Sequence, residues 1–187
     1  LHFTKLSYGV LPLVLDKYIL LNSGSALGSG VGPLLVKNEK LNIKNVEEQL
    51  IAIPGEHTTA HMLFSLAYPT AKNKVFLRYD EIESFVLGNK GLGVIIHENR
   101  FTYEAKGLQK ITDLGDFWEK ETNNPIPLGG IVAMRSLNVE ISLQVDKLIR
   151  KSIGYAYEHH YKELAHYVKN NSQEMQEDVM RKHIDLY

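Results

Sequence analysis

Two short segments about forty residues apart combine residue types that could do chemistry. The segment Ile51–Ala60 begins as an apolar strand, breaks at Pro-Gly, and continues into a helix whose first turn carries Thr58 and Thr59. The segment Val94–Phe101 is a second apolar strand, which ends on His97. If the two strands are neighbours in one sheet, a helix N-terminus and a titratable base lie at the same edge.

That combination predicts a small-anion pocket that contains a proton acceptor. The first turn of a helix offers backbone N–H groups and the positive end of the helix dipole, and hydroxyl groups add donors. An imidazole titrates near neutral pH and can act as a general base. Two simpler interpretations stay open: Thr58 or Thr59 as an ordinary helix cap, and His97 as a histidine that only hydrogen-bonds a loop.

Other segments give weaker indications. Ser7, at the end of the extended segment Lys5-Leu6-Ser7, could donate to a ligand oxygen. The glycine- and serine-rich run Ser23–Gly32 resembles a phosphate-binding loop in composition but lacks both glycine motifs of nucleotide sites, so a turn lining a cleft is the better interpretation. His57 and His61 have the spacing of metal ligands on one helix face, but without the H-E-x-x-H motif we expect no metal site.

The elements that must position these residues alternate between strands and helices. We expect strands at Lys17–Leu21, Leu34–Val36, Ile51–Ile53, Lys74–Arg78 and Gly91–His97, and helices at Thr58–Ala67, from Asp80, at Asp113–Thr122, and over about 141–161 and 172–183. A further helix is expected to start at Asn45, with Glu47 and Glu48 in its first turn. This alternation predicts βαβ units and a parallel sheet in an α/β fold.

The order of the elements favours two lobes. Lobe one would contain residues 1–37 and 128–187, and lobe two the inserted residues 38–127, with crossing strands near Leu34–Val36 and Ile131–Ala133. Ligands of such folds bind in the crevice at the carboxyl ends of the strands. Because the chain starts without Met and stops after a helical run, we expect it to be truncated at both ends.

Composition excludes several classes of function. The net charge of −1 gives no basic field for a nucleic acid, and no apolar run approaches the ~20 residues of a membrane span. The chain has no cysteine, which excludes disulfides and thiolate metal sites and fits a cytoplasmic location. These features indicate an ordinary globular protein with a small-molecule ligand and neither a nucleic-acid nor a membrane partner.

Several motifs, taken in order, resemble the 1,4-dihydroxy-6-naphthoate synthase family of the futalosine route to menaquinone. The matching motifs are Thr4–Ser7, Ser23–Pro33, Ile51–Gly55 with Thr58–Ala60, Ile95–Tyr103, Asp113–Gly115 with Trp118-Glu119, and Pro127–Gly130. The Ile-His-Glu-x-Arg-Phe-Thr-Tyr stretch is the most specific of them. The resemblance implies the two-lobed fold of type II periplasmic binding proteins, and a lyase that cleaves cyclic dehypoxanthinylfutalosine to 1,4-dihydroxy-6-naphthoate and dihydroxyacetone without a cofactor.

The resemblance also implies roles for residues of this chain. His97 matches the proton acceptor of the family, while Lys5, Leu6, Ser7, Thr58 and Thr59 match segments that contact the substrate. Two other functions remain as alternatives: a non-catalytic solute-binding module for a small organic acid, and the sister enzyme of the pathway, a chorismate dehydratase. Four tyrosines of the C-terminal helices could form a homodimer face or could simply pack within the fold: Tyr155, Tyr157, Tyr161 and Tyr167.

Overall fold

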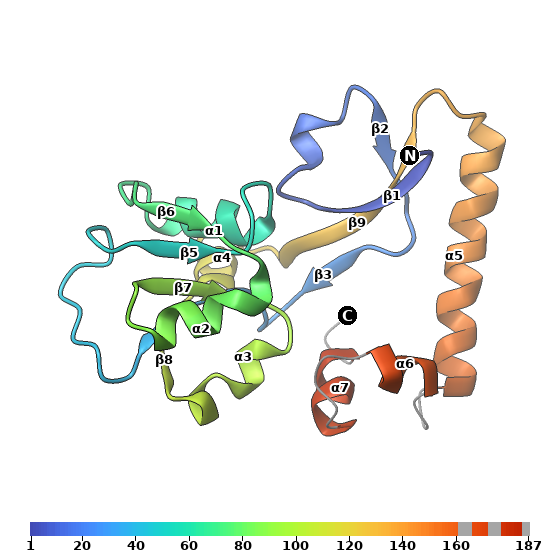
Figure 1. The fold of residues 1–187 in the computed structure, drawn as a ribbon. Coiled ribbons are helices and arrows are strands. Elements are labelled where there is room, and N and C mark those ends of the chain that lie inside the picture. The colour runs from blue at the N-terminus through green and yellow to red at the C-terminus, as the bar shows by residue number, and fades with distance from the viewer. Residues whose placement is uncertain (161–165, 172–176, 185–187) are drawn as a thin grey trace. The chain divides into compact units, whose positions relative to one another are not determined.

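The computed structural model describes residues 1–160, 166–171 and 177–184, and Figure 1 labels its elements. The strands are β1 (Phe3–Ser7), β2 (Tyr18–Leu20), β3 (Ala26–Gly28), β4 (Leu34–Asn38), β5 (Ile51–Ile53), β6 (Lys74–Phe76), β7 (Leu92–Ile95), β8 (Leu108–Asp113) and β9 (Ile126–Met134). The helices are α1 (Thr59–Ala67), α2 (Ile82–Leu87), α3 (Asn99–Thr102), α4 (Leu114–Thr122), α5 (Val139–His160), α6 (His166–Asn171) and α7 (Glu177–Ile184), with short 3₁₀ turns at Leu11–Leu13, Tyr79–Glu81 and Glu104–Lys106.

Contacts divide the chain into two compact units. Unit 1 contains Leu1–Ala26 and the described residues from Leu128 onward, and unit 2 contains Leu27–Pro127. The divisions fall within β3 and β9, whereas the sequence analysis placed the first boundary after residue 37. The eleven residues 27–37 therefore belong to unit 2, where β4 is an internal strand.

Unit 2 is built on a five-stranded mixed sheet with the order β6-β5-β7-β4-β8. Strand β5 pairs in parallel with β6 and with β7, as the strand–helix alternation predicts. Strand β4 runs antiparallel to both β7 and β8. Because β8 is antiparallel to β4, it runs in the same direction as β5, β6 and β7. The prediction of a parallel sheet is therefore wrong for β4 alone among the five strands.

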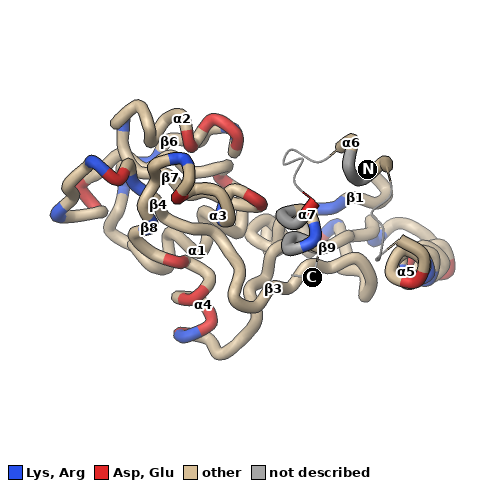
Figure 2. The backbone as a smooth tube through the Cα atoms, turned by 90° about the horizontal axis from the view of Figure 1, so that it is seen from below, with Lys and Arg blue, Asp and Glu red and all other residues tan. Residues whose placement is uncertain are grey.

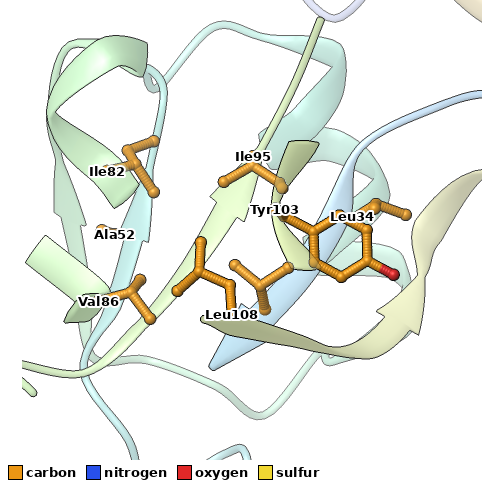
Figure 3. Packing of buried hydrophobic residues seen from close by; sticks show 8 residues of the cluster. Leu34, Ala52, Ile82, Val86, Ile95, Tyr103 and Leu108 are labelled. Atoms are coloured by element: carbon orange, nitrogen blue, oxygen red, sulfur yellow. The ribbon is translucent and has the colours of Figure 1, made fainter. Parts of the chain in front are cut away.

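Both faces of this sheet are covered, which explains why its inner strands are apolar without alternation. Ile51, Ala52 and Ile53 are all fully buried. Alternate side chains of the strands point to opposite faces. One face packs against α2, where eight buried residues form the cluster of Figure 3: Leu34, Val36, Ala52, Ile82, Val86, Ile95, Tyr103 and Leu108. In Figure 1, α2 lies in front of the sheet and α1 and α4 lie behind it.

Unit 1 contains an antiparallel sheet with β9 between β1 and β2, and β3 also pairs with β9. The 22-residue helix α5 follows β9. The Asp146 carboxylate of α5 accepts a hydrogen bond from the backbone N–H of Ser23 at 2.8 Å. Within the described ranges, none of the helices combines the length and apolar composition that a membrane crossing requires. Acidic and basic residues are interspersed along the backbone, in keeping with the net charge of −1 (Figure 2).

The segment around Asn45 differs from its prediction. The helix predicted from Asn45 is wrong: residues 41–50 are irregular, with a turn at 47–48, and the Asn45 side chain accepts a hydrogen bond from the Glu47 N–H at 3.0 Å. Asn45 therefore caps a turn, which is the alternative use of a side chain that competes with the backbone.

Of the four tyrosines considered for a dimer face, Tyr161 lies outside the described residues, and Tyr155, Tyr157 and Tyr167 are exposed.

Candidate functional site

The segments that contain the candidate functional residues Thr58, Thr59 and His97 follow strands that end at one edge of the unit 2 sheet. Ala52 of β5 is registered with Gly93 of β7 in a parallel pair, so the two strands end at the same edge. This confirms the neighbourhood predicted from the two apolar segments. Because β4 runs the other way, its first residue, Leu34, lies beside Ile95 at this edge, and β8 ends there with Asp113 beside Leu34. The start of β4 and the start of α4 thus join the ends of β5 and β7.

The N-terminus of α1 follows β5 after the short connection 54–58, and Thr58 caps it. The Thr58 hydroxyl oxygen accepts from the His61 N–H at 3.2 Å, and its hydrogen is donated to the Gly55 carbonyl at 2.7 Å. The Gly55 backbone has φ +151°, a conformation that favours glycine. The simpler interpretation of Thr58 as a helix cap therefore describes this hydroxyl in the structure.

Thr59 is buried, and its hydroxyl donates to the Pro127 carbonyl at 2.8 Å. That bond ties the first residue of α1 to the start of β9. A threonine hydroxyl has a single hydrogen to donate. Direct donation from Thr58 or Thr59 to a ligand oxygen would therefore require that the bond to Gly55 or Pro127 be given up.

His97 lies two residues beyond β7 and is exposed. Its backbone is left-handed, with φ +57°, which costs an L-residue about 1–2 kcal/mol. The other non-glycine residues with positive φ in the described part of the chain are Asn89 and Asn123, and asparagine is the residue type that tolerates this conformation best. The His97 ring meets the Tyr79 ring edge to face, with centroids 5.6 Å apart. Strained backbone conformations cluster at functional sites, so this conformation favours a functional role for His97.

Arg100 connects the His97 turn to the start of β4 and to α4. Its guanidinium donates to the Gly32 carbonyl at 2.6 Å and to the Asp113 carboxylate at 2.9 Å, with a longer contact to the Gly30 carbonyl at 3.4 Å. The Asp113 side chain also caps α4 by accepting from the N–H groups of Gly115 and Asp116. The sequence analysis quoted Arg100 and Asp113 within motifs but assigned neither of them a role, and Tyr79 gave no signal at all.

Lys5, Leu6 and Ser7 lie in unit 1, at the end of β1. They pair with Ile131, Gly130 and Gly129 of β9, in that order. The Ser7 hydroxyl accepts from the Gly9 N–H at 3.3 Å, which closes the turn after the strand. The contact of these three residues with a substrate stays a prediction.

Of the two histidines considered as metal ligands, His61 has other partners in unit 2. His61 Nδ1 lies 2.7 Å from the Glu56 carbonyl and must donate to it, so Nε2 accepts from the Lys74 ammonium at 3.1 Å. Burial, helped by nearby Lys72, lowers the pKa of Lys74, whose ammonium also donates to Ser65. In the described ranges, no three His, Cys, Asp or Glu side chains are grouped so that they could hold a metal ion.

The glycine- and serine-rich run does not form a phosphate-binding loop. It contains β3 and then leads into β4, so no helix N-terminus follows it. Its last glycine, Gly32, has φ +143° and packs on the α4 backbone, where an added Cβ would lie 2.8 Å from Gly115 Cα. The run therefore provides a close backbone approach between two segments of unit 2.

Comparison with known proteins gives consistent matches. A family model described as menaquinone biosynthesis matches residues 1–187. A 1,4-dihydroxy-6-naphthoate synthase of Thermus thermophilus is 42% identical over 188 residues, covering 100% of this chain and 68% of the relative. The enzyme of that name from Streptomyces coelicolor is 39% identical over 189 residues, covering 98% and 66%. The chain thus spans about two thirds of the length of these relatives.

Solved structures agree with the predicted fold class. Protein AF1704 of Archaeoglobus fulgidus superimposes with a TM-score of 0.91 at 30% identity, covering 100% of this chain and 69% of that one. A putative periplasmic sulfonate-binding protein of Methylobacillus flagellatus gives a TM-score of 0.61 at 16% identity, over 100% and 58% of the two chains. The second likeness shows the fold alone and confirms a periplasmic-binding-protein-like architecture. Because the family model matches all 187 residues, the chain belongs to the menaquinone biosynthesis family, and its most informative relatives there are 1,4-dihydroxy-6-naphthoate synthases.

Proposed function

We propose that the full-length protein is a lyase that converts cyclic dehypoxanthinylfutalosine to 1,4-dihydroxy-6-naphthoate and dihydroxyacetone. The observation that carries the proposal is the parallel pairing of β5 with β7, which brings the N-terminus of α1 and His97 to one edge of the sheet. The names of the two relatives support the same product. A small-molecule substrate, no added cofactor and a cytoplasmic location are part of the proposal.

In the proposed mechanism, His97 is the general base. Its imidazole removes a proton from a carbon of the substrate next to a carbonyl-like centre. A retro-aldol-type cleavage of a carbon–carbon bond then releases the three-carbon unit, and aromatisation of the new ring supplies the driving force. General-base catalysis of this kind contributes about 10²–10⁴-fold to a rate.

The first turn of α1 is proposed to bind the substrate carboxylate or a developing oxyanion. Its backbone N–H groups and the positive end of the helix dipole favour an anion there. Thr58 and Thr59 then act mainly by fixing this turn, since their hydroxyl hydrogens are donated to Gly55 and Pro127. Ser7 is proposed as a further donor from β1.

The proposal is tested by substrate choice. The full-length protein is mixed separately with cyclic dehypoxanthinylfutalosine and with chorismate, and products are followed by absorbance and mass. We expect naphthoate from the first compound and no reaction with chorismate. Turnover of chorismate alone would identify the sister activity, and tight binding of the first compound without turnover would identify a solute-binding module.

A further inference from the structure

Arg100 links its own turn to two other segments at the sheet edge. Its backbone N–H approaches the His97 carbonyl at 3.3 Å, and its guanidinium reaches Gly32, Gly30 and Asp113. The Gly32 and Asp113 partners are 68 and 13 residues away along the chain. Arg100 thus joins the turn of His97 to the segment that leads into β4 and to the last residue of β8.

The ion pair between Arg100 and Asp113 is mostly shielded from water. The side chains are 15% and 8% exposed, and their closest atoms are 2.9 Å apart. Asp113 has little freedom to move, because one of its carboxylate oxygens accepts from two backbone N–H groups at the start of α4. The guanidinium is therefore attached to a rigid support, and salt screens a partly buried pair much less than an exposed one.

His97 needs support of this kind because its backbone is in an unfavourable conformation. A left-handed histidine returns to a right-handed or extended conformation unless the residues around it prevent this. Arg100 lies three residues later, in α3, and is the anchored end of that turn. We infer that Arg100 is a positioning residue, which holds His97 in the left-handed conformation that presents its imidazole at the sheet edge.

The inference rests on the proposed function only in its statement about catalysis. It also gives a role to the glycine-rich segment, which the proposed function does not use. The carbonyl groups of Gly30 and Gly32 are two of the acceptors of Arg100. A planar guanidinium can reach acceptors in different directions at once, whereas a lysine ammonium places all its donors on a single nitrogen. Arg100→Lys is accordingly expected to restore only part of the function.

The test compares full-length variants by steady-state kinetics and by NMR of the histidine rings. Arg100→Gln is expected to lower kcat about 10²-fold, as misplacement of a catalytic group does, with KM changed much less. Arg100→Lys should lie between Arg100→Gln and the parent. In a His97→Gln background, Arg100→Gln should cause no further loss, because the two residues act as one unit. The matched control is Arg181→Gln, which removes an exposed ion pair with Glu177 on α7.

The NMR measurement makes the inference independent of turnover. The His97 ring signal is assigned by its loss in His97→Gln, and we expect Arg100→Gln and the milder Asp113→Asn to shift or broaden that signal while those of His159 and His160 stay in place. An unchanged His97 signal in folded Arg100→Gln or Asp113→Asn would overturn the inference. A parent protein without turnover, but with the expected NMR change, would contradict the proposed function and leave the positioning role standing.

Discussion

At the scale of single residues, the bond between Thr59 and Pro127 is the clearest test of what the threonines do. The Thr59 hydroxyl donates to the Pro127 carbonyl at a buried position, so Thr59→Val should lower the free energy of unfolding by about 1–3 kcal/mol. Thr59→Ser keeps the hydroxyl and should cost less. Urea denaturation measures the effect, with the exposed Thr70→Val as a control within about 0.5 kcal/mol of the parent. Equal stability of Thr59→Val and the parent would contradict this account of the bond.

Tyr103 predicts a dependence of stability on alkaline pH. Burial, followed by the hydrogen bond that its hydroxyl donates to Glu104, raises the pKa of Tyr103 above its usual value of about 10. The folded state therefore holds this proton more tightly than the unfolded state, and the stabilisation is present below pH 10 and is lost as the pH rises through the raised pKa. Between pH 9 and pH 11, the parent should lose more stability than Tyr103→Phe, by at most about 1.4 kcal/mol per pH unit. The same pH dependence of the free energy of unfolding in the two proteins would refute this.

The candidate residues were predictable where chemistry and position coincide in the sequence. His97 closely follows an apolar strand, and Thr58 and Thr59 open a helix, so residue type and place could be read together. The Arg100 contacts could not be predicted, because their acceptors are backbone carbonyls 68 and 70 residues away. No local pattern marks a carbonyl as the partner of an arginine.

At the scale of elements, the sequence predicted the existence of strands and helices better than their direction. The alternation from β5 to β7 gave the parallel pairs correctly, since each crossover contains a helix. Strand β4 alone runs against the other strands of this sheet, and its direction depends on where the chain enters unit 2. Periodicity contains no information about that topology. The false helix at Asn45 has another cause: the same side chain can cap a helix or close a turn.

Two glycine substitutions are predicted to have opposite effects on stability, one in α4, which packs on the segment before β4, and one on α5. A Cβ at Gly115 would lie 2.1 Å from the Val31 carbonyl oxygen, so Gly115→Ala should be destabilising by about 1–3 kcal/mol as the backbone is pushed apart. Gly154 lies on α5 with nothing within 4 Å of the added Cβ, so Gly154→Ala should be stabilising by about 0.5–1 kcal/mol. Thermal unfolding of both variants measures the difference. A stabilising Gly115→Ala would contradict the close approach of these two segments.

At the scale of the whole molecule, fold and catalysis are separate questions. The architecture is shared with periplasmic binding proteins at 16% identity, so the fold alone does not distinguish an enzyme from a receptor. The sequence placed the second boundary of the inserted lobe after residue 127 and the first after residue 37, and the structure divides the chain after Pro127 and after Ala26. The first boundary differs because β4, an apolar strand that looks like a crossing strand in the sequence, is paired on both sides within unit 2.

The most direct measurement of the central claim uses the full-length protein with His97→Gln, and His160→Gln as the matched control on the exposed α5 surface. The turnover rate and the dissociation constant of cyclic dehypoxanthinylfutalosine are measured for each. We predict that His97→Gln lowers the rate of naphthoate formation by at least about 10²-fold, with the dissociation constant changed only a few-fold, and that His160→Gln matches the parent. Naphthoate formation at the parent rate in His97→Gln would contradict the claim that His97 is the base.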